Sequence, residues 1–200
     1  MTHQKKIVIA TSNEHKLREI LEILTGLDAE ILSLKDFPGI GEIAETGNSF
    51  RENAFIKAST VFRHTNLLTL ADDSGLEVDA LNGAPGIYSA RFSGRERDYA
   101  ANNTKLLREL KNVPEEKRGA QFRCVVAIVE HGVKEFAEGI VRGRIITELR
   151  GERGFGYDPL FIPDGFNKTY AELGEEVKNQ ISHRAKAFRA AKAILQEILF

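Results

Sequence analysis

At residues 67–75 the chain reads Leu-Leu-Thr-Leu-Ala-Asp-Asp-Ser-Gly. The pattern predicts a short apolar strand that ends in two adjacent carboxylates, Asp72 and Asp73, and is followed by a turn. Two buried carboxylates repel each other, and a bound metal ion is the ordinary way to relieve that repulsion. Because α/β proteins bind ligands at the ends of strands, the stretch indicates a metal-dependent site. A solvated acidic turn is the alternative, since Asp, Ser and Gly are common turn residues.

The composition is that of an ordinary globular protein. The chain has 200 residues and a formal net charge of −1, which is compatible with a single domain over residues 1–200. The balanced charge disfavours nucleic-acid polymers and anionic membranes as partners. The apolar segment Ile7–Ala10 is too short for a signal peptide or a membrane span, so we expect a cytoplasmic protein. The single cysteine, Cys124, is expected to be a buried structural thiol.

Helices alternate with strands early in the chain and hairpins follow later, which predicts an α/β protein with a mixed sheet. Four helices are expected. The first begins after Ser12 or Asn13, the second at the capping box Ser49–Glu52, the third at Asp98 and the last at Ser182. The first helix should bury one apolar stripe, comprising Leu17, Ile20, Leu21 and Leu24. The expected strands cover residues 6–10, 31–34, 67–73, 121–130, 133–138, 140–146 and 160–162.

The turn between the first strand and the first helix reads Thr11-Ser12-Asn13-Glu14-His15-Lys16. Free backbone N–H groups at a helix start bind anions, and the helix dipole assists them. Lys16 lies in the first helical turn, where the dipole disfavours a cation, and a bound phosphate would remove that conflict. The alternative is a capped helix with an exposed lysine. The glycines of a P-loop are missing.

Carboxylates also suggest a hard metal ion. Glu45 precedes the second helix, and together with Asp72 and Asp73 it offers the oxygen ligands that Mg²⁺ or Mn²⁺ prefer. Lys57 lies on the helix that follows Glu45 and could reach the same site. The alternative for Lys57 is a solvated helix surface, where most lysines are found.

Two further segments are candidates for ligand binding. In Gly154-Phe155-Gly156-Tyr157-Asp158-Pro159, glycines allow close backbone approach and the aromatic ring can stack on a base. A rigid turn with a core aromatic residue is the alternative. Lys178 and Ser182-His183-Arg184 place cations at a helix start, against the dipole, which often marks a functional site. Their alternative is an ordinary basic helix surface.

Together these motifs resemble the inosine triphosphate pyrophosphatase family along nearly the whole chain. Minor departures are Ser12, where many relatives carry glycine, and Val177, where some carry glutamate. The resemblance is carried by ordered motifs, namely Thr11-Ser12-Asn13 with Lys16, Glu45-Thr46-Gly47 with Glu52-Asn53-Ala54, Ala71–Leu76, Gly83–Arg91, Gly154–Pro159 and Ser182-His183-Arg184.

The resemblance implies a homodimer of α/β subunits, each with an elongated mixed sheet flanked by helices and two lobes with the active site in the cleft between them. It also implies a single nucleoside triphosphate pyrophosphatase domain that hydrolyses ITP, dITP and XTP to the monophosphate and pyrophosphate. Such an activity would remove deaminated purines from the nucleotide pool. Mg²⁺ would be the cofactor, with Mn²⁺ as a substitute.

The resemblance also implies a role for each candidate site residue. Asp73 is expected to be the base that activates water, and Glu45, Asp72 and Asp73 are expected to bind the metal. The residues expected to contact the phosphates are Thr11, Ser12, Asn13, Lys16, Lys57 and Ser74. Those expected to contact the base are Phe155, Gly156, Tyr157, Asp158, Lys178, His183 and Arg184. Side chains rich in donors at Lys178, His183 and Arg184 would favour a purine with a 6-oxo group over adenine.

Three alternative functions stay open at this point. A related pyrophosphatase could act on modified pyrimidine or 7-methylated nucleotides, and a substrate panel would distinguish it. A nucleotide-binding protein without activity is disfavoured by the complete set of carboxylates. An RNA-binding module is disfavoured by the balanced charge.

Overall fold

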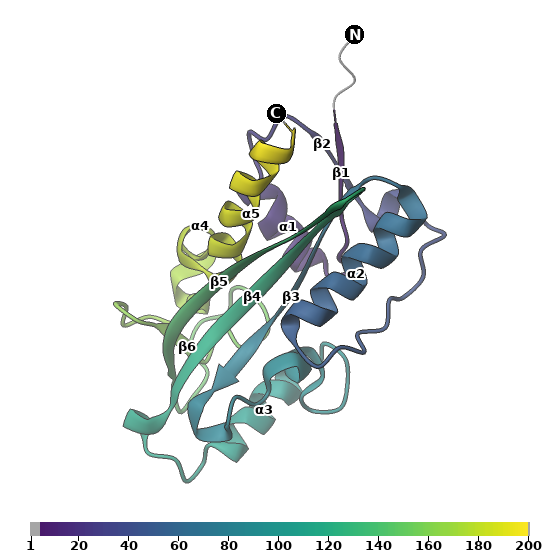
Figure 1. Cartoon of the computed structure of the whole chain (residues 1–200). Helices are drawn as coiled ribbons and strands as arrows, with labels where there is room; N and C mark the ends of the chain where they lie inside the picture. Colours follow the sequence, from purple (N-terminus) through teal and green to yellow (C-terminus); the bar gives the residue numbers. More distant parts are fainter. Residues whose placement is uncertain (1–4, 200) are drawn as a thin grey trace. The chain divides into compact units, whose positions relative to one another are not determined.

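A computed structural model describes residues 5–199 of the chain. In that range the strands form one sheet of 6 strands in the order β2-β1-β3-β4-β5-β6 (Figure 1). β1 pairs in parallel with β2 and β3, whereas β5 and β6 are antiparallel. The predicted mixed α/β fold is therefore confirmed. The strands are β1 (Lys6–Ile9), β2 (Glu30–Ser33), β3 (Leu68–Val78), β4 (Gly119–Glu130), β5 (Val133–Ile145) and β6 (Phe161–Pro163).

Five α-helices and several short 3₁₀ turns connect the described strands. The helices are α1 (Glu14–Ile23), α2 (Phe50–Thr65), α3 (Tyr99–Glu109), α4 (Tyr170–Ile181) and α5 (His183–Leu199). The 3₁₀ turns are Leu34–Asp36, Asp79–Leu81, Gly86–Arg91 and Glu115–Lys117. The sequence reading missed α4, because Gly174 interrupts it with a non-helical φ of 82° and breaks the apolar periodicity. Within residues 5–199, no helix is both long enough and apolar enough to cross a membrane.

The chain divides into two compact units. Unit 1 comprises residues 1–73, 124–139 and 184–200, and unit 2 comprises residues 74–123 and 140–183. In unit 1, alternate residues of β1 point to opposite faces of the sheet, as the strand period requires. Ile7 and Ile9 pack in a cluster with α1 and α5, whereas Val8 packs in another cluster with α2. Figure 1 accordingly shows α2 across the sheet from α1 and α5.

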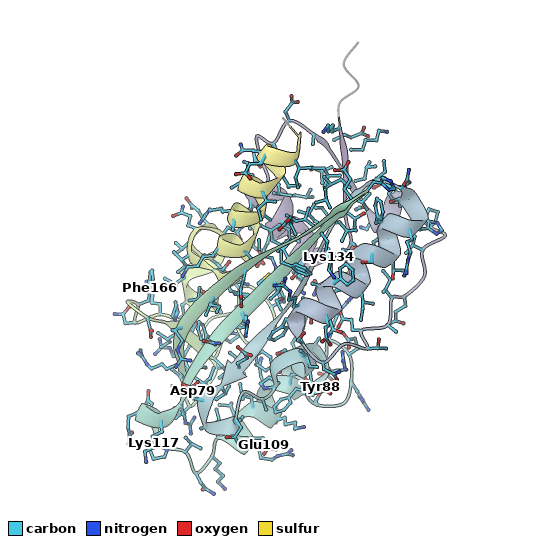
Figure 2. The ribbon with its side chains drawn as sticks, viewed as in Figure 1. Asp79, Tyr88, Glu109, Lys117, Lys134 and Phe166 are labelled. Carbon is cyan, nitrogen blue, oxygen red and sulfur yellow. The ribbon has the colours of Figure 1, made fainter. Side chains whose placement is uncertain are left out.

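Unit 2 has its own core, in which residues of β3, β4, β5 and β6 pack with α3 and α4. Aromatic rings fill its centre. The ring of Phe122 meets that of Phe161 edge-on at 4.8 Å, and Phe161 lies 5.3 Å from Tyr170. Four large apolar side chains of this unit are exposed, namely those of Tyr88, Ile140, Leu149 and Phe166, and Figure 2 labels Tyr88 and Phe166.

The strand that carries the two aspartates is longer than the sequence predicted. β3 continues through Asp72 and Asp73 to Val78, so the predicted strand end and turn are wrong. Both aspartates are buried, with 2% and 5% of their surfaces exposed, and the solvated acidic turn is therefore also wrong. Buried carboxylates can remain inside a sheet when cations and hydrogen-bond donors compensate them.

Three smaller predictions need correction. The predicted strands 133–138 and 140–146 form one continuous strand, β5, because Gly139 stays extended. Leu21 is exposed rather than buried in the apolar stripe of α1. At the start of α2, Ser49 accepts the Glu52 N–H group as predicted, but the Glu52 carboxylate accepts the Asn48 N–H group instead of completing a capping box.

Arg118 is a buried cation that hydrogen-bonds to main-chain carbonyl groups of unit 2. Its Nε donates to the carbonyl of Val113 at 2.9 Å, and its Nη2 donates to that of Leu110 at 2.8 Å. Its Nη1 lies 3.4 Å from the carbonyl of Ile146. Leu110 is the C-terminal cap of α3, where helix carbonyls lack partners inside the helix. Arg118 therefore joins the end of α3 to the end of β5.

We expect Arg118→Met to lower the free energy of unfolding by about 2–3 kcal/mol, because buried carbonyl groups would lose their donors. Lys117→Met is the matched control, since Lys117 is the exposed neighbour (Figure 2). Urea titrations of both variants measure the difference. Equal stabilities would show that the three hydrogen bonds of Arg118 contribute nothing net.

Candidate active site

The start of α1 holds the first group of candidate residues. Asn13 caps the helix, and its Oδ1 accepts the N–H groups of His15 at 3.0 Å and Lys16 at 3.3 Å. Thr11 in turn accepts the N–H group of Asn13 at 3.2 Å, and Ser12 is exposed. The Nζ of Lys16 donates to Asp72 at 3.0 Å, with only 15% of the lysine side chain exposed. The alternative of an exposed lysine is therefore wrong.

Asp72 is the centre of a buried charge network on the α1 and α5 side of unit 1. Its Oδ2 lies 3.0 Å from Lys16 Nζ, 3.5 Å from Arg184 Nη2 and 3.8 Å from Cys124 Sγ. Arg184 also donates from Nη1 to Glu19 at 2.6 Å. Burial alone would raise the pKa of Asp72, but Lys16 and Arg184 outweigh burial and hold that pKa well below its ordinary value. Lys16 and Arg184 therefore favour the ionised form of Asp72.

Asp73 belongs to a separate network with α2. Its Oδ2 accepts a hydrogen bond from Asn53 Nδ2 at 3.1 Å, and its Oδ1 lies 3.5 Å from Lys57 Nζ. The same lysine donates to Glu45 at 2.5 Å, so the predicted reach of Lys57 to both acids is confirmed and a solvated surface lysine is excluded. Burial raises the pKa of Asp73, and Lys57 and Lys16 offset that effect only in part. For Lys57, burial lowers the pKa, but Asp73 and Glu45 outweigh burial and raise it.

The neighbouring aspartates thus have opposite electrostatic environments. Consecutive strand residues point to opposite faces, so the two carboxylates have different nearest cations, Lys16 and Arg184 for Asp72 and Lys57 for Asp73. These cations compensate part of the negative charge of the pair. Two adjacent acids whose pKa values are pushed apart are typical of a site with one fixed anion and one proton acceptor. Of the two, Asp73 is the acid whose pKa burial raises.

Glu45 and Asp73 are the carboxylates placed to bind a metal ion. Among residues 5–199, no three side chains of Asp, Glu, His or Cys come close enough together to form a complete metal site. Glu45 and Asp73 nevertheless both contact the Nζ atom of Lys57, so their carboxylates lie close enough together to bind one cation. Mg²⁺ usually binds one or two protein carboxylates and keeps water or substrate phosphates as its other ligands. The donor set therefore fits Mg²⁺ bound together with a phosphate ligand.

Unit 2 contains the loop 154–159. Asp158 organises it, because its Oδ2 accepts the Phe155 N–H group at 2.9 Å and the Lys178 ammonium group at 2.6 Å. Gly154 has a φ of +78°, and a Cβ atom there would lie 2.2 Å from Asp158 Oδ2. Only glycine allows the carboxylate to approach the loop this closely.

The Phe155 ring lies among polar and aromatic neighbours. Lys178 Nζ is 4.4 Å from the centroid of that ring, and the Lys178 and Asp158 side chains are each 3% exposed. Tyr99, at the start of α3, meets Phe155 at 6.0 Å between ring centroids. Phe155 is half-buried whereas Tyr157 is buried, so the alternative of a turn with a core aromatic residue applies to Tyr157.

Nearly the whole chain, across both units, is similar to known proteins. A model of the Ham1 family matches residues 7–194. The chain belongs to the Ham1 family. It is 51% identical over 194 residues to a dITP/XTP pyrophosphatase of Desulforamulus reducens, covering 96% of both chains. It is 49% identical over 195 residues to a dITP/XTP pyrophosphatase of Listeria innocua, covering 97% of this chain and 96% of the relative.

Solved structures of the Ham1 family have the same fold. The Ham1 protein of Staphylococcus aureus is 40% identical, with a TM-score of 0.87, and the match covers 97% of this chain and 100% of that chain. A nucleoside-triphosphatase, dITP/XTP pyrophosphatase, of Mycobacterium abscessus is 46% identical, with a TM-score of 0.77, covering 95% and 98%. The family resemblance inferred from the ordered motifs is confirmed.

The candidate residues of this Ham1 protein fall into two groups, one in each unit. His183 is buried in unit 2, where its ring stacks on Phe122 at 4.6 Å, so an ordinary surface helix is excluded. Arg184, predicted to join the base contacts, lies in unit 1 with its guanidinium at Asp72 and Glu19. Ser74 lies half-buried in β3.

Several residues with contacts to the site were missed in the sequence. Asn53 belongs to the motif Glu52-Asn53-Ala54, but the sequence predicted no role for it. Glu19 is one of several charged residues of the amphipathic helix α1, so its position alone did not indicate a partner. Asn103 donates to the carbonyl of Gly156 at 3.0 Å and holds the loop 154–159 from α3. Tyr99 had no sequence signal, because its meaning depends on Phe155 being beside it.

Proposed function

We propose that this protein hydrolyses ITP, dITP and XTP to the corresponding monophosphate and pyrophosphate. The observation that carries the proposal is near-full-length similarity to Ham1-family proteins named dITP/XTP pyrophosphatase. The opposite environments of Asp72 and Asp73 support it, because hydrolysis needs a proton acceptor next to fixed charge. The biological result would be a nucleotide pool cleared of deaminated purines.

Asp73 is the proposed general base. It accepts a proton from a water molecule whose oxygen bonds to the α-phosphorus, while the bond from that phosphorus to the α–β bridging oxygen breaks and pyrophosphate leaves. Asp72 stays ionised and holds Lys16, whose charge favours the phosphates. The side chains proposed to contact the triphosphate are those of Thr11, Ser12, Asn13, Lys16, Lys57 and Ser74.

Glu45 and Asp73 would hold Mg²⁺, with Asp72 acting through water and Mn²⁺ as a substitute. When bound, the ion would neutralise negative charge on the triphosphate and on the leaving pyrophosphate. Because Lys57 now contacts both Glu45 and Asp73, its ammonium group would share them with the ion or move toward the phosphates.

The loop 154–159 and Lys178 are proposed to recognise the base. Phe155 would stack on it, with Gly156 and Tyr157 shaping the loop. Lys178 and His183 supply donors for a 6-oxo group, whereas adenine would leave its amino group opposite donors. A buried polar group without a partner costs roughly 1–3 kcal/mol, so two such mismatches would disfavour ATP by about a hundredfold or more. Because of its contacts, we assign Arg184 to holding Asp72 instead.

We also propose that both units act together as one domain, that the protein is a homodimer and that it works in the cytoplasm. The substrate assignment is tested by measuring pyrophosphate release with Mg²⁺ from ITP, dITP, XTP, ATP, GTP, a modified pyrimidine triphosphate and 7-methyl-GTP. ITP, dITP and XTP should be hydrolysed with the highest kcat/KM. Preference for the pyrimidine or the 7-methylated nucleotide would overturn the proposal, and binding without hydrolysis would make the protein a non-enzymatic binder.

We expect Glu45→Gln to raise the Mg²⁺ concentration that gives half-maximal activity. The amide keeps the shape of the side chain but loses the charge that would attract the ion and that now pairs with Lys57. Glu42→Gln is the matched control, because Glu42 is an exposed acid in the same loop. If Glu45→Gln needed the same Mg²⁺ concentration for half-maximal activity as the wild type, Glu45 would not bind the ion and would serve the structure of the loop instead.

A further inference from the structure

Asn53 is a fully buried polar residue in the first turn of α2, with 0% of its surface exposed. Both ends of its amide are used within unit 1. Its Oδ1 accepts the N–H group of Gly47 at 2.8 Å, and its Nδ2 donates to Asp73 Oδ2 at 3.1 Å. A buried amide is costly unless its hydrogen bonds are made, so this placement is specific.

These partners fix which way the amide points. A backbone N–H group can only donate and an ionised carboxylate can only accept. The carbonyl end of Asn53 must therefore face Gly47, and its NH₂ end must face Asp73. Glycine at position 47 allows this approach, because a Cβ atom there would lie 2.8 Å from Asn53 Oδ1 and 2.6 Å from Glu52 Cβ.

The same amide links two parts of the proposed site. Gly47 is two residues from Glu45, which pairs with Lys57, and Lys57 also contacts Asp73. Asn53 thus holds the loop that carries Glu45 with one hydrogen bond and fixes one oxygen of Asp73 with the other. The second oxygen, Oδ1, is left facing Lys57.

We infer that Asn53 is a positioning residue that orients the Asp73 carboxylate for proton transfer and keeps the Glu45 loop in register with it. The inference rests on the proposed function, in which Asp73 is the base. Because Asn53 is fully buried and both ends of its amide are bonded to protein groups, we assign it no direct contact with substrate. Its loss should therefore lower kcat while changing KM little, since catalysis depends on geometry more sharply than binding does.

A double-mutant cycle with dITP as substrate tests the inference. Asn53→Ala should lower kcat about 10- to 100-fold, the effect typical of losing a residue that orients a reacting group. In the Asp73→Asn background, the same substitution should lower kcat by a much smaller factor, because only the effect on the Glu45 loop remains. An equal fall in both backgrounds would overturn the inference, because Asn53 would then act without Asp73.

Two further variants separate positioning from folding. Ser49→Ala removes the α2 cap, whose Oγ accepts the Glu52 N–H group at 3.1 Å, and should cost stability but leave kcat unchanged. Asn53→Leu keeps a similar volume but can neither accept the Gly47 N–H group nor donate to Asp73. It should fold and lose kcat even if Asn53→Ala does not fold.

Different results would overturn the role of Asn53 and the proposed hydrolysis. If Asn53→Leu folded with wild-type kcat, or if Asn53→Ala resembled Ser49→Ala, Asn53 would serve helix packing and the inference would be wrong. If the wild-type protein released no pyrophosphate from dITP, ITP or XTP, the proposed function itself would be wrong, whatever Asn53 does.

Discussion

Asp73→Asn should lower kcat for dITP by about 10²–10⁴-fold, the usual contribution of a general base. The asparagine amide has the shape of the carboxylate but cannot take a proton from water. The neighbouring donor, Asn53, can still donate to the new amide oxygen, so we expect the fold to survive. Steady-state kinetics, together with a thermal unfolding curve, would measure both effects.

The control for Asp73→Asn is Asp164→Asn, which makes the same chemical change at an exposed position. That variant should keep wild-type kcat. If Asp73→Asn also retained turnover within a few fold of the wild type, Asp73 would be a structural acid and not the general base. Another group would then have to activate the water.

Arg184→Met should lower the free energy of unfolding by about 3–5 kcal/mol, the usual effect of removing one partner from a buried charge network. Arg184 is 2% exposed, and its removal would leave Glu19 buried without this cation and Asp72 with one cation fewer. Adding Glu19→Leu to Arg184→Met should recover part of the loss, because the uncompensated charge disappears. Denaturant titrations of the single and double variants would measure this.

Arg189→Met, at an exposed position of α5, is the matched control and should change stability little. Kinetics add a second test. If Arg184 holds Asp72, Arg184→Met should lower kcat/KM for ITP and ATP by the same factor. A selective loss for ITP would instead return Arg184 to base recognition, as the sequence first suggested.

The sequence predicted the fold class because its local signals agree with the final structure. The cap at Asn13 forms, and Asp98 caps α3 by accepting the Ala101 N–H group at 3.0 Å. The alternation of strand and helix patterns also corresponds to the parallel pairing of β1 with β2 and β3. Such features depend on residues that are neighbours in the chain, which is why a single sequence contains them.

What the sequence could not predict depends on contacts between distant residues. Arg184 and Glu19 meet across 165 positions of the chain, and neither position alone indicates a partner. The sequence also predicted that the strand would end at the two aspartates. In fact β3 continues through them to Val78, so their side chains point to two faces and have different nearest cations. Tertiary context therefore decided which charges compensate one another.

The central claim is that water attacks the α-phosphorus of a deaminated purine triphosphate. The most direct test is to hydrolyse dITP with the wild-type protein and Mg²⁺ in ¹⁸O-labelled water and to analyse both products by mass spectrometry. The account predicts dIMP carrying the label and pyrophosphate without it. Label in pyrophosphate, or release of orthophosphate instead of pyrophosphate, would contradict it.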